Sequence, residues 1–317
     1  MRRDIIALAE MGKGIMVRDL SQNAFACFFK NYDYYWLKYT FERGTKENIT
    51  SLLVGHSMPR FGVNDNDIPG LINLSFMSQD YYYSFKIIEK ALKDMPSIKT
   101  VILGTSYMSP FMDLSKSKNS GEIARVVNVY GRYFHDIHNL HRDIYETNLA
   151  DIVECSEDME EYIFELYNQR KEDYFCRERN RQSLSDIIWS DPLSEDKRMD
   201  LVKKRTAFHN KFLAYTDAYS ENLEILKNIA EICESGHAEL IIVVFPSNSY
   251  YRRAIDPRFK ESYQRQIEKI EKRYSVRCVD LYDSDRFDSI YDFVDTDHLN
   301  DRGAAAMTQF LRCYLRE

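Results

Sequence analysis

The fold of this chain is decided by the stretch SLLVGHS at residues 51–57. A short apolar run that ends in a glycine predicts a buried strand, here Ser51–Gly55. Pro59 follows closely and suits the first turn of a helix. Ser57 is therefore predicted to lie at a strand-to-helix turn.

The same pattern recurs outward along the chain. Four further apolar runs predict strands at residues 71–74, 100–104, 240–245 and 276–281. The helices between them are expected to begin near Ser78, Ser220, Asp256-Pro257 and Asn300 or Asp301, and Gly236 is placed to end one of them. Strands that alternate with helices and are apolar on both faces predict a three-layer α/β/α fold with a five-stranded parallel sheet.

The strand and helix rhythm stops between residues 109 and 219, where the sequence becomes helical, charged and aromatic. We expect residues 1–48 to form a helical extension and residues 49–317 the main domain, interrupted by an insertion or cap at 109–219. His135, His138 and His141 lie in this insertion at spacings of three. On a helix they spread over a wide arc, which favours a solvated helix face over a metal site.

Composition excludes several classes of function. The chain has 317 residues and a net charge of −7, which does not favour binding to nucleic acid. No dinucleotide or P-loop motif follows a strand, and no cofactor is expected. Glu10 interrupts the apolar N-terminal run well short of a membrane span, which predicts a cytoplasmic protein, either dissolved or peripheral to the inner face of the membrane. Scattered cysteines predict reduced thiols, with neither a zinc site nor a disulfide framework.

Ser57 and the stretch DTDH at residues 295–298 together indicate a catalytic site with a serine nucleophile. A serine hydroxyl becomes a nucleophile when an imidazole accepts its proton and a carboxylate orients that imidazole. His298 and Asp295 supply these two groups, although Asp292 and Asp297 compete with Asp295 for the second role. The non-catalytic alternatives are that the serine simply forms part of a turn and that the acidic stretch caps a helix. A metal is disfavoured because no second histidine or cysteine lies nearby.

The order of four motifs resembles the SGNH (GDSL-like) hydrolases. In that superfamily the motifs G-D-S, N-x-G and G-x-N-D follow the first, second and third strands. The fourth motif, D-x-x-H, lies near the C-terminus. The matching stretches here are residues 55–57, 73–75, 104–107 and 295–298. The resemblance covers residues 51–107 and about 223–317, and it leaves out the insertion. It implies a catalytic set of Ser57, His298 and Asp295, with an oxyanion site formed by the N–H groups of Ser57 and Ser75 and the Ser106 side chain.

Three of these stretches depart from the superfamily pattern. Ser75 stands where the second motif has a glycine, a change that its backbone N–H survives. His56 replaces the aspartate of the first motif, and Ser106 replaces the longer asparagine of the third. Losing one oxyanion donor typically costs about 2.7–4 kcal/mol of transition-state stabilisation, which argues against efficient hydrolysis by water. The same losses suit a non-enzymatic member of the fold that binds glycan or scaffolds other proteins.

The tail DHLNDRGA at residues 297–304 is similar to one branch of the superfamily. That branch includes the D-alanine transfer protein of teichoic acid synthesis and the alginate O-acetylation proteins of bacteria. The resemblance implies an O-acetyltransferase or O-acyl esterase acting on a cell-surface polysaccharide or its precursor. The expected partners are an acyl donor, a glycan or glycan precursor and proteins of polysaccharide biosynthesis.

Overall fold

A five-stranded parallel sheet forms the centre of the protein. The computed structural model describes residues 21–149, 155–170, 189 and 192–316. The strands lie in the order β2-β1-β3-β4-β5, and every neighbouring pair is parallel. Their bounds are Ser51–Gly55 (β1), Leu71–Asn73 (β2), Thr100–Thr105 (β3), Glu239–Val244 (β4) and Val276–Asp280 (β5). The predicted α/β class and the five parallel strands are confirmed.

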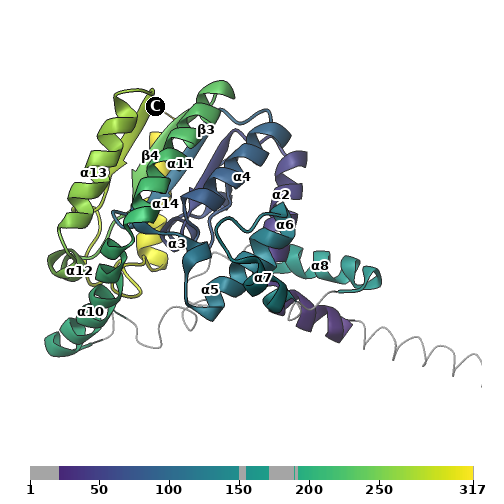
Figure 1. Cartoon of the computed structure of the whole chain (residues 1–317), viewed down its shortest axis with the longest axis horizontal. Coiled ribbons are helices and arrows are strands. Elements are labelled where there is room, and N and C mark those ends of the chain that lie inside the picture. The colour runs from purple at the N-terminus through teal and green to yellow at the C-terminus, as the bar shows by residue number, and fades with distance from the viewer. Residues whose placement is uncertain (1–20, 150–154, 171–188, 190–191, 317) are drawn as a thin grey trace, which may run out of the picture.

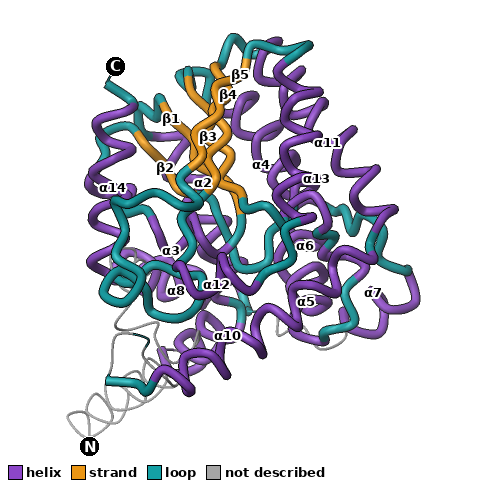
Figure 2. The backbone as a smooth tube through the Cα atoms, turned by 90° about the vertical axis from the view of Figure 1, so that its left-hand side faces the viewer, coloured by secondary structure: helices purple, strands orange, loops and turns teal. Residues whose placement is uncertain are grey.

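Helices cover both faces of this sheet, so alternate strand residues enter two different cores. Leu52 and Val54 of β1 belong to one buried cluster, whereas Leu53 between them belongs to the other. Figure 2 shows the strands with α14 on one side and α4, α11 and α13 on the other. The covering helices are α2 (Tyr32–Lys46), α3 (Ser57–Gly62), α4 (Tyr81–Asp94), α11 (Thr216–Ser235), α12 (Ser249–Ala254), α13 (Arg258–Glu271) and α14 (Asp301–Tyr314).

The insertion gathers near the carboxyl ends of the strands. In Figure 1, α5, α7 and α10 lie at the end of the sheet where β1 passes into α3. Its described α-helices are α5 (Ser120–Arg125), α6 (Arg132–Phe134), α7 (Arg142–Leu149), α8 (Glu160–Arg170) and α10 (Glu195–His209). Residues 150–154, 171–188 and 190–191 of the predicted insertion lie outside the described part. The carboxyl ends of the strands form the edge at which ligands bind in an open parallel sheet.

Several predicted helix boundaries are confirmed and two are wrong. The Asn300 side chain caps α14 by accepting from Gly303 N–H at 3.1 Å, and Gly236 follows α11, as expected. Helix α4 is instead capped by Asp80, which accepts from Tyr83 N–H at 3.0 Å. Ser220 lies inside α11 and not at its start. Helix α11 begins at Thr216, after Tyr215, whose side chain makes no capping bond.

The prediction that the three histidines lie along one solvated helix is wrong. His135 ends α6, and His138 lies in the following loop; both have left-handed backbone, with φ of 54° and 51°. The His138 ring stacks on Tyr82 at 3.7 Å between centroids, and its Nε2 lies 2.9 Å from Glu221. This histidine therefore joins the insertion to α4 and α11 through a mostly buried network.

The N-terminal region joins the main core directly. Trp36 and Phe41 of α2 pack in the same cluster as Leu52 of β1. Cys27 and Cys155 form a disulfide with Cα atoms 6.3 Å apart, which corrects the expectation of reduced thiols. The two positions are 128 residues apart, so their spacing carried no signal. Within the described residues, none of the helices is both long and apolar enough to cross a bilayer.

Candidate active site

Ser57, His298 and Asp295 come together at the carboxyl edge of the sheet. Ser57 is the first residue of α3, and the other two lie in the loop between β5 and α14. Ser57 Oγ is 2.8 Å from His298 Nε2, although the two residues are 241 positions apart. On the other side of the ring, His298 Nδ1 lies 2.8 Å from Asp295 Oδ2 and 3.1 Å from Oδ1. The three side chains therefore form a continuous hydrogen-bonded chain.

The local fold of the loop holds Asp295 in place. Its Oδ1 accepts from the backbone N–H groups of Asp297 at 2.9 Å and His298 at 2.8 Å. Its carbonyl oxygen accepts from Asn248 Nδ2 at 3.2 Å, which ties the loop to the residues after β4. The bond between Val294 N–H and His298 O, 2.9 Å long, closes the loop. The carboxylate consequently has little freedom to turn away from the imidazole.

Geometry separates the three candidate acids. Asp295 contacts the imidazole, Asp297 is bound by Arg205 in α10, and Asp292 accepts from Asp288 N–H at 2.7 Å and pairs with Arg302 at 3.0 Å. Asp295 is thus the acid in hydrogen-bonding contact with Nδ1.

Electrostatics favour an ionised Asp295. Burial opposes ionisation, but the His298 ring and its hydrogen bond outweigh burial and hold the pKa of Asp295 below its usual value. An ionised carboxylate accepts the Nδ1 proton, which leaves the lone pair of Nε2 directed at the Ser57 hydroxyl. The chain of contacts can then draw a proton from Ser57 to His298.

The turn that presents Ser57 depends on a close approach of two strands. Gly55 has φ of +147°, and a Cβ there would lie 2.1 Å from the carbonyl oxygen of Gly104 in β3. His56 caps α3, with its Nδ1 accepting from Met58 N–H at 3.2 Å. Burial, reinforced by the nearby His298, lowers the pKa of His56 to about 3, so its ring is neutral at neutral pH. Ser57 N–H is at the first helical position, where a helix offers no acceptor.

The other two predicted oxyanion residues already have partners. Ser75 N–H donates to Asn73 Oδ1 at 3.1 Å, so an oxyanion role would require that amide to change its acceptor. Ser106 N–H donates to Ser109 Oγ at 2.9 Å, and the two hydroxyls are 3.2 Å apart. The Ser106 hydroxyl can rotate, whereas the Ser75 amide is held. The oxyanion roles of Ser57, Ser75 and Ser106 stay predictions.

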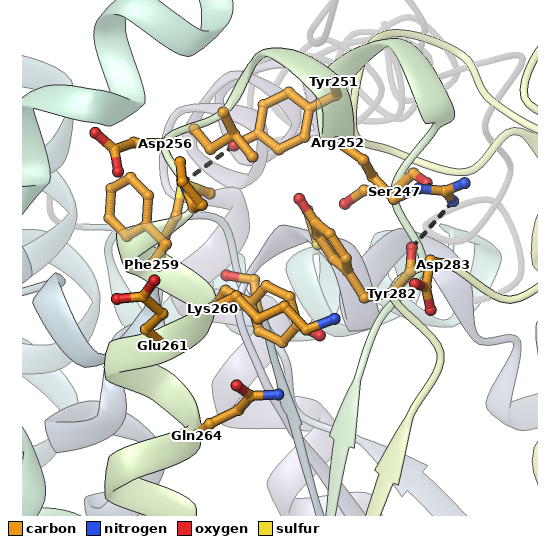
Figure 3. Close-up of a pocket in the computed structure, with 16 residues that line it drawn as sticks. Ser247, Tyr251, Arg252, Asp256, Phe259, Lys260, Glu261, Gln264, Tyr282 and Asp283 are labelled. Carbon is orange, nitrogen blue, oxygen red and sulfur yellow. Dashed lines mark hydrogen bonds between the residues drawn. The ribbon is translucent and has the colours of Figure 1, made fainter.

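A cavity of about 390 Å³ opens beside this site. Met58, the residue after Ser57, and Ser106 are among its lining residues, and α12, α13 and the residues after β5 form other walls. Figure 3 shows the rings of Tyr251, Phe259 and Tyr282 on different sides of this space. Its charged lining residues are Arg252, Asp256, Lys260, Glu261 and Asp283. The cavity therefore combines aromatic rings with charged side chains of both signs.

Sequence reasoning missed Arg205 and Asn248. Arg205 follows two lysines in a charged helix, a pattern that resembles any solvated helix face. Asn248 could have been found, because it follows the strongest predicted strand as Ser57, Ser75 and Ser106 follow theirs. It is fully buried, and its Oδ1 also caps α12 through Tyr251 N–H at 3.0 Å.

Two groups in the described residues bring metal-ligand atoms within 4.8 Å of one another, namely Asp295, Asp297 and His298, and Asp80, Asp113 and His138. In the first group Arg205 occupies both oxygens of Asp297. In the second, Asp80 accepts from the backbone N–H groups of Tyr83 and Leu114 at 3.0 and 2.7 Å. These carboxylates already have protein donors, so neither group requires a cation.

Comparisons with known proteins find only distant similarity. No protein-family model and no curated protein matches the chain. Among solved structures it is similar to a proposed acylhydrolase from Bacteroides fragilis NCTC 9343, with a TM-score of 0.41 and 11% identity over 86% of this chain and 93% of that one. It is also similar to a GDSL-like lipase from Bacteroides thetaiotaomicron VPI-5482, with a TM-score of 0.38 and 9% identity over 86% and 89% of the two chains. At this distance, function has to be argued from the residues of the site itself.

Proposed function

We propose that the protein is a serine-dependent acyl-transfer enzyme of the SGNH type. One observation carries this proposal: Ser57 Oγ lies 2.8 Å from His298 Nε2, while Asp295 holds Nδ1 of the same ring at 2.8 Å. Nucleophile, base and orienting acid are thus connected in the order that covalent acyl transfer needs.

In the first half-reaction, Ser57 Oγ attacks the carbonyl carbon of an acyl donor. His298 Nε2 takes the hydroxyl proton as the new C–O bond forms, and Asp295 stabilises the resulting imidazolium. The tetrahedral oxyanion accepts from Ser57 N–H, with the Ser106 hydroxyl as the second donor. Its collapse breaks the bond to the leaving group, which takes the proton from His298, and Ser57 is left as an ester.

In the second half-reaction, an acceptor hydroxyl attacks the Ser57 ester. His298 removes the proton of this hydroxyl and then returns a proton to Ser57 Oγ as the ester bond breaks. A sugar hydroxyl as acceptor makes the protein an O-acyltransferase, whereas water makes it an O-acyl esterase. We favour the transferase on the resemblance to O-acetylation proteins, because the occupied Ser75 amide weakens the oxyanion site equally for a sugar hydroxyl and for water.

A glycan or glycan precursor is the acceptor that we propose. Aromatic faces with polar groups around them suit the apolar faces and hydroxyls of a sugar, and the cavity beside Ser106 combines both. Three acids and two bases line it, so it offers no excess of positive charge to hold an anionic acceptor. The resemblance to O-acetylation proteins suggests a further set of partners, and we propose that these are the proteins that make the polysaccharide.

The cytoplasmic location is also only a proposal. The Cys27–Cys155 disulfide speaks against it, because disulfides persist mainly in oxidising compartments.

A non-enzymatic glycan-binding or scaffolding protein is the alternative. The occupied Ser75 amide favours it, since a site without a second backbone oxyanion donor is what a degenerate enzyme would retain.

Intact-mass spectrometry after treatment with a serine-reactive fluorophosphonate tests the proposal. We expect one adduct on the wild type, mapped to Ser57, and none on Ser57→Ala or His298→Ala. Ser235→Ala is the matched control, because this exposed serine lies at the far end of α11. A folded wild type that takes no adduct would support the binding protein instead. If the adduct forms, release of p-nitrophenol from p-nitrophenyl acetate with and without sugar acceptors separates transferase from esterase.

A further inference from the structure

Arg205 reaches from the insertion into the loop that carries His298. It lies in α10, and its guanidinium binds Asp297 through two parallel contacts, Nε to Oδ1 at 2.9 Å and Nη2 to Oδ2 at 2.8 Å. The Asp297 side chain is only 3% exposed, whereas that of Arg205 is 37% exposed. Thr296 Oγ1 donates to the same carboxylate at 2.7 Å. A bidentate pair of this kind is among the strongest in proteins and fixes the position of both groups.

Without Arg205, Asp297 would compete with Asp295 for the charge on His298. A ligand atom from each of Asp295, Asp297 and His298 lies within 4.8 Å of the other two. Two unneutralised carboxylates at this distance would repel each other and would both attract a proton onto the imidazole. A base that already carries a proton cannot accept one from Ser57. The arrangement therefore needs a permanent positive charge beside Asp297.

The other groups around His298 do not supply that charge. His56, from the turn after β1, and His209, from α10, both have a pKa lowered to about 3, chiefly by burial. Tyr251 of α12 is neutral because burial raises its pKa well above the usual value, and it lies 2.6 Å from His209 Nδ1. Of the described groups that act on Asp297, Arg205 is thus the permanent cation. Burial opposes ionisation of Asp297, but the guanidinium outweighs it and holds the pKa of this carboxyl far below its usual range.

We propose that Arg205 is a positioning residue, which neutralises Asp297 so that Asp295 alone orients and charges His298. This inference rests on the proposed acyl-transfer function. It makes α10 of the insertion part of the active site, since the sheet domain by itself would present two competing carboxylates. Arg205 acts through Asp297 and needs no contact with the substrate.

The test uses paired substitutions and two readouts. Arg205→Ala leaves Asp297 uncompensated, so His298 should keep its proton to higher pH. Asp297→Asn leaves Arg205 uncompensated, so His298 should lose its proton at lower pH. We expect shifts of about one pH unit or more in these opposite directions. In the double variant both charges are gone, and the midpoint should return to within about 0.3 unit of wild type.

The first readout is the midpoint of the His298 titration, followed by NMR in protein labelled with ¹³C-histidine and assigned with His298→Ala. The second is the pH dependence of the rate at which a fluorophosphonate labels Ser57. Arg205→Lys retains the charge without the planar fork and should shift both midpoints by less than half as much as Arg205→Ala. Lys204→Ala is the matched control, because this neighbour in α10 pairs with Asp200 and should shift neither midpoint.

Opposite shifts that cancel in the double variant support the inference. Lower thermal stability in Arg205→Ala with both midpoints unchanged overturns it, because a merely structural pair would behave in that way. If Arg205→Ala does not fold, Asp297→Asn, Arg205→Lys and the double variant decide the question by the same criteria. Wild-type protein that takes no fluorophosphonate refutes the proposed function, while the NMR titration still decides the role of Arg205.

Discussion

Replacing Asp295 by asparagine should remove nearly all of the proposed acyl-transfer activity while the fold stays intact. The Asp295 Oδ1 atom accepts from two backbone N–H groups, at 2.9 and 2.8 Å. An asparagine keeps these bonds through its own Oδ1, which places its NH₂ group against His298 Nδ1. Because NH₂ can only donate, the ring must then carry its proton on Nε2, and it can no longer accept one from Ser57.

The size of the loss follows from this change of tautomer. The same substitution in a serine–histidine–aspartate site lowers kcat by about 10⁴-fold. At about 1.4 kcal/mol per factor of ten, this is roughly 5.5 kcal/mol of transition-state stabilisation. The uncharged asparagine also removes the ion pair that stabilises the imidazolium.

The assay is the initial rate of p-nitrophenol release from p-nitrophenyl acetate, or of fluorophosphonate labelling, with thermal unfolding as the check on folding. Asp285→Asn is the matched control, because it makes the same change in charge at an exposed position of the same loop. We expect the control to keep wild-type activity. A folded Asp295→Asn protein with activity within tenfold of wild type would refute the assignment of Asp295.

Three further predictions concern the fold. Gly55→Ala should destabilise the protein by several kcal/mol in urea unfolding, because its Cβ would lie 2.1 Å from a β3 carbonyl oxygen, whereas Gly121→Ala in α5 should change stability by less than about 1 kcal/mol. Burial raises the pKa of Asp80 to about 6, so its contribution to stability is present below pH 4 and is lost as the pH rises through 6. The unfolding free energy of wild type should therefore fall between pH 4 and 6 relative to that of Asp80→Asn, and parallel pH profiles would contradict this. Cys27 and Cys155 should resist alkylation by iodoacetamide until the unfolded protein is reduced, and labelling of both without reductant would exclude the disulfide.

Local pattern was sufficient for the sheet and for the outline of the site. Each strand is a short run of buried apolar residues, and each run is bounded by glycine, proline or polar residues that end it. Such features depend only on neighbouring residues, which is why β1 to β5 lie where the sequence predicts them. Ser57 and the stretch 295–298 could be paired because they follow the order of motifs in a known superfamily.

Other features depend on groups that are remote in the sequence. His138 was misplaced on a helix because its stacking partner Tyr82 and its acceptor Glu221 lie 56 and 83 positions away. Spacing carried no information on the disulfide between Cys27 and Cys155. The Ser75 amide, expected to be available, is occupied by an asparagine two residues earlier, a contact that the motif pattern does not report.

The sequence by itself determined the α/β class, the parallel sheet and the edge at which Ser57, Ser75 and Ser106 lie. These follow from hydrophobic periodicity and from the rule that parallel strands end on one side of a sheet. Only the tertiary structure decided which carboxylate contacts His298 and which is neutralised by Arg205. The bond between Arg205 and Asp297, 2.9 Å long, joins residues 92 positions apart and leaves Asp295, three residues before His298, as the acid on the ring. Coulomb and hydrogen-bond energies are set by such distances and not by position along the chain.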